Sequence, residues 1–320
     1  MPEVVINTGD GWLQPMHVYA TALAHSARPG FFAGRWASVI VAAINAGVVF
    51  LVGWRVFGGY IAALAATLVL ILTPAHMTYG RQGLEAIYIV PFVLLWLYAL
   101  AGFIDKDRPS QIAAASAALG AGVYSTTAAP LTMAFLWLMM IVVLWTVGRR
   151  KLSTVAIAAA GFALMLLPLA LWFAFHPQTY MDTYGSWVIH PAHLRNPIDG
   201  LLATINRNAL GTRVSAYWSL IDPSYLFFSS TDGRAPLHWL VAPLLAVGIY
   251  RCMKKPKAMT LITLAGAAVA PIAGASFGRP HYIANALALL PFVALLAGHG
   301  VDQIRELIAP PPPPPSDEEY

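Results

Sequence analysis

The sequence contains a single cysteine, Cys252, among its 320 residues. An intramolecular disulfide needs two cysteines and a thiolate metal cluster needs several, so the sequence excludes both. Charged residues are also scarce, at 10% of the chain, whereas a soluble globular domain has about 25%. This shortage excludes an ordinary soluble domain for most of the chain, because its surface would lack the usual charged side chains.

Three local signals are absent as well. Residues 1–11 contain neither a basic residue nor a long apolar run, so they do not form a secretory signal peptide. The sequence has no His-Glu-x-x-His motif, which would indicate a zinc site of the metalloprotease type. It also has no glycine-rich loop of the nucleotide-binding type, so we predict no cytoplasmic nucleotide held by such a loop. Dependence on a divalent metal stays open.

Apolar runs dominate what is present. Hydrophobic residues make up 58% of the chain and the mean hydropathy is +0.66, so a single anchor does not account for the composition. A transmembrane helix needs about 20 predominantly apolar residues. We predict spans at residues 36–53, 60–76, 84–104, 111–127, 130–147, 154–174, 237–252, 259–276 and 281–300. The predicted fold is therefore an all-α polytopic membrane protein with about nine transmembrane helices.

Basic residues are distributed unevenly between alternate loops, which predicts the orientation of the spans. One set of loops carries Arg55, Lys106, Arg108, Arg149, Arg150, Lys151, Arg251, Lys254, Lys255, Lys257 and Arg305. The opposite short loops carry only Arg81 and Arg279. By the positive-inside rule, the first set, Cys252 and the C-terminus are cytoplasmic, and the N-terminus lies outside. We therefore attribute the net charge of +5 to the basic cytoplasmic loops of a protein in the cytoplasmic (inner) membrane. We predict no nucleic-acid partner.

The spans divide the chain into five parts. These are an extracytoplasmic N-terminal segment (1–35, the rest of a first outer loop), helices one to six (36–176), a large extracytoplasmic loop (177–236), helices seven to nine (237–303) and a proline-rich cytoplasmic tail (304–320). The large loop is rich in aromatic residues, which suits a layer on the bilayer surface. Because the N-terminal segment needs a preceding span to be translocated, we expect a hydrophobic segment upstream of Met1.

Ionisable residues in the outer turns are candidates for function, because such groups are costly beside the hydrocarbon core. Arg81 and Glu85 are four residues apart, so they share one helix face if the third span begins there. They form either an ion pair at the helix end or a pair that faces a phosphate or sugar. Arg279 and His281 lie in a second outer turn, where the arginine either binds phosphate or anchors the chain at the interface.

Asp232 and Arg234 flank a glycine just before the seventh predicted span. Their position is typical of turn residues. The alternative is that they contribute to the same substrate site as the two outer turns.

Four passages together resemble one family of membrane enzymes. They are Gln14-Pro-Met-His-Val-Tyr-Ala-Thr-Ala with Gly34-Arg-Trp-Ala-Ser and Trp54-Arg-Val-Phe-Gly; Leu72-Thr-Pro-Ala-His-Met-Thr-Tyr-Gly-Arg with Glu85; Tyr225-Leu-Phe-Phe-Ser-Ser-Thr-Asp-Gly-Arg; and Gly278-Arg-Pro-His with Leu289-Leu-Pro-Phe. Their order and spacing are similar to those of the polyprenyl-phosphate-sugar-dependent membrane glycosyltransferases of the GT-C fold. The likeness is closest to the protein mannosyltransferase and aminoarabinose transferase group.

The resemblance implies transfer of a sugar from a polyprenyl-phosphate donor to a protein, lipid or glycan acceptor at the outer membrane face. In this family a carboxylate acts as general base in a direct, inverting displacement, and cationic groups stabilise the departing phosphate. The substrate-binding residues that it implies are Arg81, Glu85, Asp232, Arg234, Arg279 and His281. No cofactor is implied beyond the lipid-linked donor.

The catalytic aspartate of this family lies in the first outer loop, and the present chain begins inside or just after that loop. We therefore expect the base upstream of residue 1, which predicts a truncated chain that is inactive as it stands. Asp10 and Glu85 are weaker candidates within the chain. Two other functions stay open: a polytopic transporter or lipid-carrier flippase, and a non-catalytic GT-C-like subunit. A transporter needs ionisable residues near mid-span, whereas Asn45 is one of few strongly polar residues there.

Overall fold

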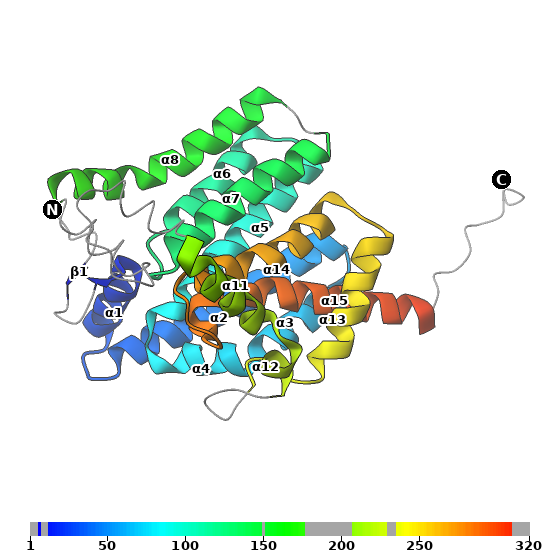
Figure 1. The fold of residues 1–320 in the computed structure, drawn as a ribbon, viewed down its shortest axis with the longest axis horizontal. Coiled ribbons are helices and arrows are strands. Elements are labelled where there is room, and N and C mark those ends of the chain that lie inside the picture. The colour runs from blue at the N-terminus through cyan, green and yellow to red at the C-terminus, as the bar shows by residue number, and fades with distance from the viewer. Residues whose placement is uncertain (1–5, 8–11, 149–150, 177–206, 229–234, 309–320) are drawn as a thin grey trace, which may run out of the picture.

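The computed structural model describes residues 6–7, 12–148, 151–176, 207–228 and 235–308. These residues fold almost entirely into helices (Figure 1). The exception is an antiparallel pair of two-residue strands, β1 (Ile6–Asn7) and β2 (Trp12–Leu13). The predicted all-α fold class is confirmed.

Each predicted span contains at least one helix. In chain order, the elements are α1 (Pro15–Ala27), α2 (Ala33–Phe57), α3 (Tyr60–Leu72), α4 (Pro74–Gln82), the 3-10 turn η1 (Glu85–Tyr88), α5 (Ile89–Lys106), α6 (Pro109–Gly122), α7 (Ala129–Thr146), α8 (Leu152–Phe175), α11 (Arg207–Ile221), α12 (Pro223–Phe227), α13 (Val241–Lys254), α14 (Ala258–Ser276), the 3-10 turn η2 (Ile283–Ala286) and α15 (Leu289–Ile308).

Five of the described segments are long and apolar enough to cross a membrane. They are α2, η1 with α5 (Glu85–Lys106), α7, α8 and α14. α3 and α4 add a sixth if this pair, bent by 58°, counts as one span. α6 and α13 have 14 residues each, about 21 Å of helix against a hydrocarbon core of about 30 Å. The chain is therefore a multi-pass membrane protein, while the number nine and the large outer loop stay predictions.

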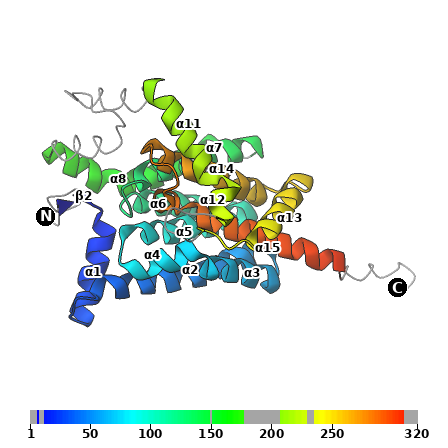
Figure 2. The same ribbon diagram turned by 60° about the horizontal axis from the view of Figure 1, so that its bottom comes forward.

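The helices pack around a centre that includes α5, α14 and α15 (Figure 2). Trp96 of α5 is fully buried and meets Phe292 of α15 edge to face, with ring centroids 6.2 Å apart. α8 lies at the edge of the molecule against α6 (Figure 1) and exposes most of its apolar side chains. An apolar helix exposed in this way is expected where a protein contacts lipid.

α13 and α15 cross closely through two glycines. A Cβ atom at Gly248 would overlap the Leu296 carbonyl oxygen, and one at Gly300 would overlap the Leu244 carbonyl oxygen. The absence of side chains therefore lets the two backbones touch. One turn beyond this crossing, the Arg251 guanidinium contacts Asp302 at 3.0 Å and Glu306 at 2.7 Å, and it is only 11% exposed.

The last helix begins later than predicted. We expected a span from residue 281, but α15 begins at Leu289. Gly278 and His281 have positive φ angles of 64° and 57°, so the chain turns there instead of continuing as a helix. The 3-10 turn η2 then leads into α15.

Candidate functional site

Glu85 is held where three distant segments of the chain meet. Its Oε1 atom accepts hydrogen bonds from the Thr127 backbone nitrogen at 2.9 Å and from Thr127 Oγ1 at 2.8 Å. Its Oε2 atom accepts only a long bond, 3.4 Å, from the Gln14 backbone nitrogen. Hydrogen bonds to a carboxylate are stronger than neutral ones. Glu85 therefore fastens the start of α1 and the α6–α7 turn to η1, while Oε2 keeps lone pairs available for another partner.

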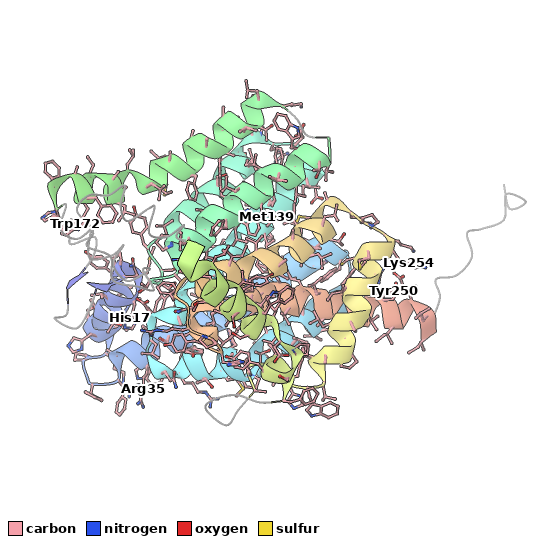
Figure 3. All side chains as sticks on the ribbon, viewed as in Figure 1. His17, Arg35, Met139, Trp172, Tyr250 and Lys254 are labelled. Atoms are coloured by element: carbon pink, nitrogen blue, oxygen red, sulfur yellow. The ribbon has the colours of Figure 1, made fainter. Side chains whose placement is uncertain are left out.

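His17 lies beside this carboxylate. Its ring meets the Tyr88 ring edge to face, with centroids 5.5 Å apart, and its buried Nδ1 atom has no hydrogen-bond partner in the described part of the chain. Burial lowers the pKa of His17 below its ordinary value, and the charge of Glu85 opposes that shift. Figure 3 places His17 and Arg35 at the opposite end of the molecule from Tyr250 and Lys254. The predicted topology likewise separates the outer turns from Lys254.

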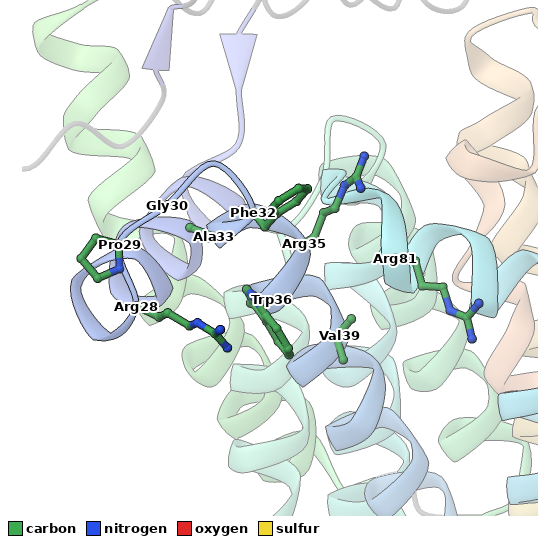
Figure 4. Close-up of a pocket in the computed structure, with 9 residues that line it drawn as sticks. All are labelled: Arg28, Pro29, Gly30, Phe32, Ala33, Arg35, Trp36, Val39 and Arg81. Atoms are coloured by element: carbon green, nitrogen blue, oxygen red, sulfur yellow. The ribbon is translucent and has the colours of Figure 1, made fainter.

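A pocket of about 550 Å³ opens at the turn between α1 and α2. We call it the arginine pocket; it is lined by Arg28, Pro29, Gly30, Phe32, Ala33, Arg35, Trp36, Val39 and Arg81. None of these residues is acidic. In Figure 4, Arg28 and Trp36 extend to the same side of the turn, while Arg81 of α4 stands at the far edge. The pocket thus joins positive charge from two separate parts of the chain with an aromatic wall.

Aromatic rings orient two of the three guanidinium groups. Arg28 Cζ lies 5.3 Å from the Trp36 ring centroid, and Arg35 Cζ lies 5.4 Å from that of Phe32. Guanidinium groups bind phosphate through paired hydrogen bonds, and stacking on a ring leaves their edge N–H groups available. The arrangement is chemically suited to an amphiphilic anion, whose charge meets the arginines and whose apolar part meets the rings.

The structure corrects the prediction that Arg81 and Glu85 share one helix face. α4 ends at Gln82, Gly83 adopts the left-handed conformation with φ of 71°, and Glu85 starts a separate 3-10 turn. Arg81 lines the arginine pocket, whereas Glu85 contacts Gln14 and Thr127. No ion pair joins the two among the described residues.

Sequence reasoning missed the pairing of Arg28 and Arg35 with Arg81. Arg35 stood only within a passage of the family resemblance, and Arg28 belonged to no motif. The available signal was the stretch 28–36, in which arginines alternate with aromatic residues just before the first long apolar run. Such residues are typical of the membrane interface.

The other predicted site residues lie apart from this pocket. Arg279 is exposed, with Cζ 6.0 Å from the Tyr282 ring. The main chain of His281 forms hydrogen bonds with the side chains of Ser219 and Tyr225. Asp10, Asp232 and Arg234, together with most of the large loop, lie outside the described residues. Within the described residues, no group of three His, Cys, Asp or Glu side chains is placed to hold a metal ion.

Comparison with solved structures shows the GT-C fold. ArnT from Cupriavidus metallidurans bound to undecaprenyl phosphate matches with a TM-score of 0.58 and 16% identity, over 94% of this chain and 52% of that one. Its apo state matches with a TM-score of 0.55 and 17% identity, over 91% and 49%. The apo oligosaccharyltransferase of Archaeoglobus fulgidus matches with a TM-score of 0.54 and 15% identity, over 93% and 43%. The chain spans about half the length of these proteins or less.

Comparison with curated protein sequences gave no match. The sequence model described as dolichyl-phosphate-mannose-protein mannosyltransferase matches residues 14–174, half of the 320-residue chain. The matched region contains Glu85, its partners Gln14 and Thr127, and the whole arginine pocket. The chain therefore belongs to the dolichyl-phosphate-mannose-protein mannosyltransferase family, whose members are polyprenyl-phosphate-dependent glycosyltransferases of the GT-C fold.

Proposed function

We propose that this protein takes part in transferring a sugar from a polyprenyl-phosphate donor to an acceptor at the outer face of the cytoplasmic membrane. The observation that carries the proposal is the arginine pocket, in which Arg28, Arg35 and Arg81 surround a space lined by Phe32 and Trp36. An isoprenoid phosphate has the matching chemistry, because its phosphate needs cationic donors and its tail needs an apolar path.

The surface next to the pocket offers such a path. Val39 lines the pocket, and Ile40 and Ile44 follow it along α2 with exposed fractions of 55% and 50%. A lipid tail lying along this face would stay in the hydrocarbon layer while its phosphate meets the arginines. The known ligand of a protein with this fold, undecaprenyl phosphate on ArnT, supports this choice of ligand class.

Glu85 is the carboxylate that we assign to the acceptor side. In an inverting transfer, the acceptor oxygen bonds to the anomeric carbon as the bond from that carbon to the phosphate oxygen breaks, and the hydroxyl proton passes to a carboxylate. The Oε2 atom of Glu85 has only a 3.4 Å hydrogen bond, so it has lone pairs for that proton.

Binding measurements on the purified protein in lipid nanodiscs test the donor site. Undecaprenyl phosphate should bind with saturation, and undecaprenol, its uncharged alcohol, at least about tenfold more weakly. Arg35→Ala and Arg81→Ala should each lower the affinity for the phosphate about tenfold. Arg108→Ala is the matched control, because Arg108 is also exposed but does not line the pocket.

Two results would overturn the assignment. One is equal affinity for the phosphate and the alcohol, and the other is an equal effect of Arg81→Ala and Arg108→Ala. Release of undecaprenyl phosphate from undecaprenyl-phosphate-mannose then tests transfer itself, and Glu85→Gln should abolish any activity that the chain has.

A further inference from the structure

A second pocket, of about 430 Å³, lies between α11, α12 and the turn that follows α14. We call it the α11–α12 pocket; it is lined by Trp218, Ser219, Ile221, Asp222, Pro223 and His281. It shares no residue with the arginine pocket. In the predicted topology, both of its walls face the outer side of the membrane.

His281 is fixed in this pocket through its backbone. The His281 nitrogen donates to Ser219 Oγ at 3.2 Å, and its carbonyl oxygen accepts from the Tyr225 hydroxyl at 2.7 Å. The same hydroxyl accepts from the Ile283 nitrogen at 3.2 Å. These bonds hold His281 in the left-handed region, with φ of 57°. The His281 ring packs against the Tyr225 ring, with centroids 4.8 Å apart. Its hydrogen bonds among the described residues use the main chain, so the imidazole nitrogens keep their hydrogen-bonding capacity for a ligand.

Asp222 lines the same pocket as His281. Its carboxylate caps α12 by accepting from the Ser224 nitrogen and the Ser224 hydroxyl. These hydrogen bonds are the main reason that the pKa of Asp222 is lowered, and the charge of His281 lowers it further. Asp222 is partly exposed, so the remaining lone pairs of its carboxylate can accept from a ligand.

Trp218 supplies a flat apolar surface on the same pocket. Its side chain is 62% exposed. The ring of Tyr217 meets the Trp218 ring edge to face, with centroids 5.6 Å apart, and this contact orients the indole. An indole ring left open beside hydrogen-bonding groups presents both an apolar face and polar neighbours, the combination found in small-molecule sites.

The charge on the pocket lining selects against anionic ligands, because the Asp222 carboxylate would repel them. A polyol fits the lining: its hydroxyls donate to the carboxylate and accept from the imidazole, and its C–H face packs on the indole. We propose that the α11–α12 pocket binds a sugar that carries no negative charge. The inference rests on the proposed function, in which that sugar belongs either to the acceptor glycan or to the lipid-linked donor.

Two binding experiments on the full chain in nanodiscs separate these sources. In the first, mannobiose represents a free acceptor glycan and is titrated by calorimetry. In the second, undecaprenyl-phosphate-mannose is compared with undecaprenyl phosphate, so that any gain in affinity is due to the sugar. Trp218→Ala should weaken the sugar-dependent binding about tenfold. Asp222→Asn should weaken it to a similar extent while keeping α12 capped, because asparagine is also a good N-cap.

Trp239→Ala is the matched control, since Trp239 is 56% exposed and stacks on His238 outside the pocket. It should leave both titrations unchanged. If Trp218→Ala and Asp222→Asn weaken mannobiose binding, the sugar in the pocket belongs to the acceptor glycan. If they reduce only the affinity that the sugar adds to undecaprenyl-phosphate-mannose, it belongs to the donor. The proposal is overturned if neither probe shows sugar-dependent binding, or if Trp239→Ala has the same effect as Trp218→Ala. Undecaprenyl phosphate binding that persists in that case would leave the arginine pocket assignment intact.

Discussion

Glu85 accepts two hydrogen bonds from Thr127, one from its backbone nitrogen and one from its hydroxyl, although the two residues are 42 positions apart. This contact joins the 3-10 turn before α5 to the turn before α7. Since the second carboxylate oxygen reaches the Gln14 backbone at 3.4 Å, one side chain fixes the relative position of three segments around the candidate site.

Thr127→Ala should lower the free energy of unfolding by about 1–2 kcal/mol, because it removes one hydrogen bond to a half-buried carboxylate. Thr127→Ser retains the hydroxyl and should lower it less. Thermal unfolding of the detergent-solubilised protein compares the three forms. Equal losses in the alanine and serine variants would show that the hydroxyl contact contributes nothing.

His17 gives the site a pH dependence. Burial keeps its pKa in the folded protein below the ordinary value, with Glu85 opposing the shift, so the unfolded chain binds a proton at a higher pH than the folded chain. Stability should therefore decrease as the pH falls below about 6.5, the ordinary pKa of histidine, and this contribution should be constant above it. His17→Gln should reduce the decrease. Thermal unfolding measured across this pH range checks the expectation.

His25→Gln is the control for that experiment, because His25 lies on the same helix but is exposed. It should leave the pH dependence as it is in the unsubstituted protein. An identical loss of stability in the His17 variant and the unsubstituted protein would contradict the expectation.

The crossing of α13 and α15 depends on the two glycines at the contact. Gly248→Ala and Gly300→Ala should each lower the free energy of unfolding by about 2 kcal/mol or more, because the added methyl group overlaps a carbonyl oxygen of the other helix. Gly47→Ala is matched to them, since Gly47 lies in α2 with nothing near the added methyl group. It should be neutral or stabilising by up to about 1 kcal/mol. Similar unfolding temperatures for all three variants would show that the close contact of α13 and α15 does not contribute to stability.

The predicted orientation of the spans can be tested by labelling introduced cysteines. Cys252 is only 1% exposed, so a membrane-impermeant maleimide should not label it in the folded protein from either side. In a Cys252→Ser background, Tyr282→Cys should be labelled in intact cells and Lys255→Cys only after permeabilisation, because both positions are exposed and the basic loops are predicted to be cytoplasmic. Labelling of both before permeabilisation would contradict the topology.

Some features of the site were predictable from local sequence and others were not. Arg81 and Glu85 were chosen as candidates from their charge beside apolar runs, and their role stays a prediction. The shared helix face expected if the third span began there is not found. A spacing of four residues places two side chains on one face only if the helix is continuous, and Gly83 in the left-handed conformation interrupts it. The burial of Asn45, which is fully buried within α2, agrees with its predicted place inside a span.

The sequence by itself determined the helical membrane class, the order of the helices and the family, because hydrophobicity and short passages are read along the chain without knowledge of distant contacts. Only the tertiary structure decided that Arg28 and Arg35 share a pocket with Arg81 and that His281 and Asp222 line another. The physical reason is that apolar helices can span a bilayer in many relative positions, so hydrophobicity alone does not fix how they pack together. Packing of small residues and a few long-range hydrogen bonds then select one arrangement, and with it the polar groups that meet.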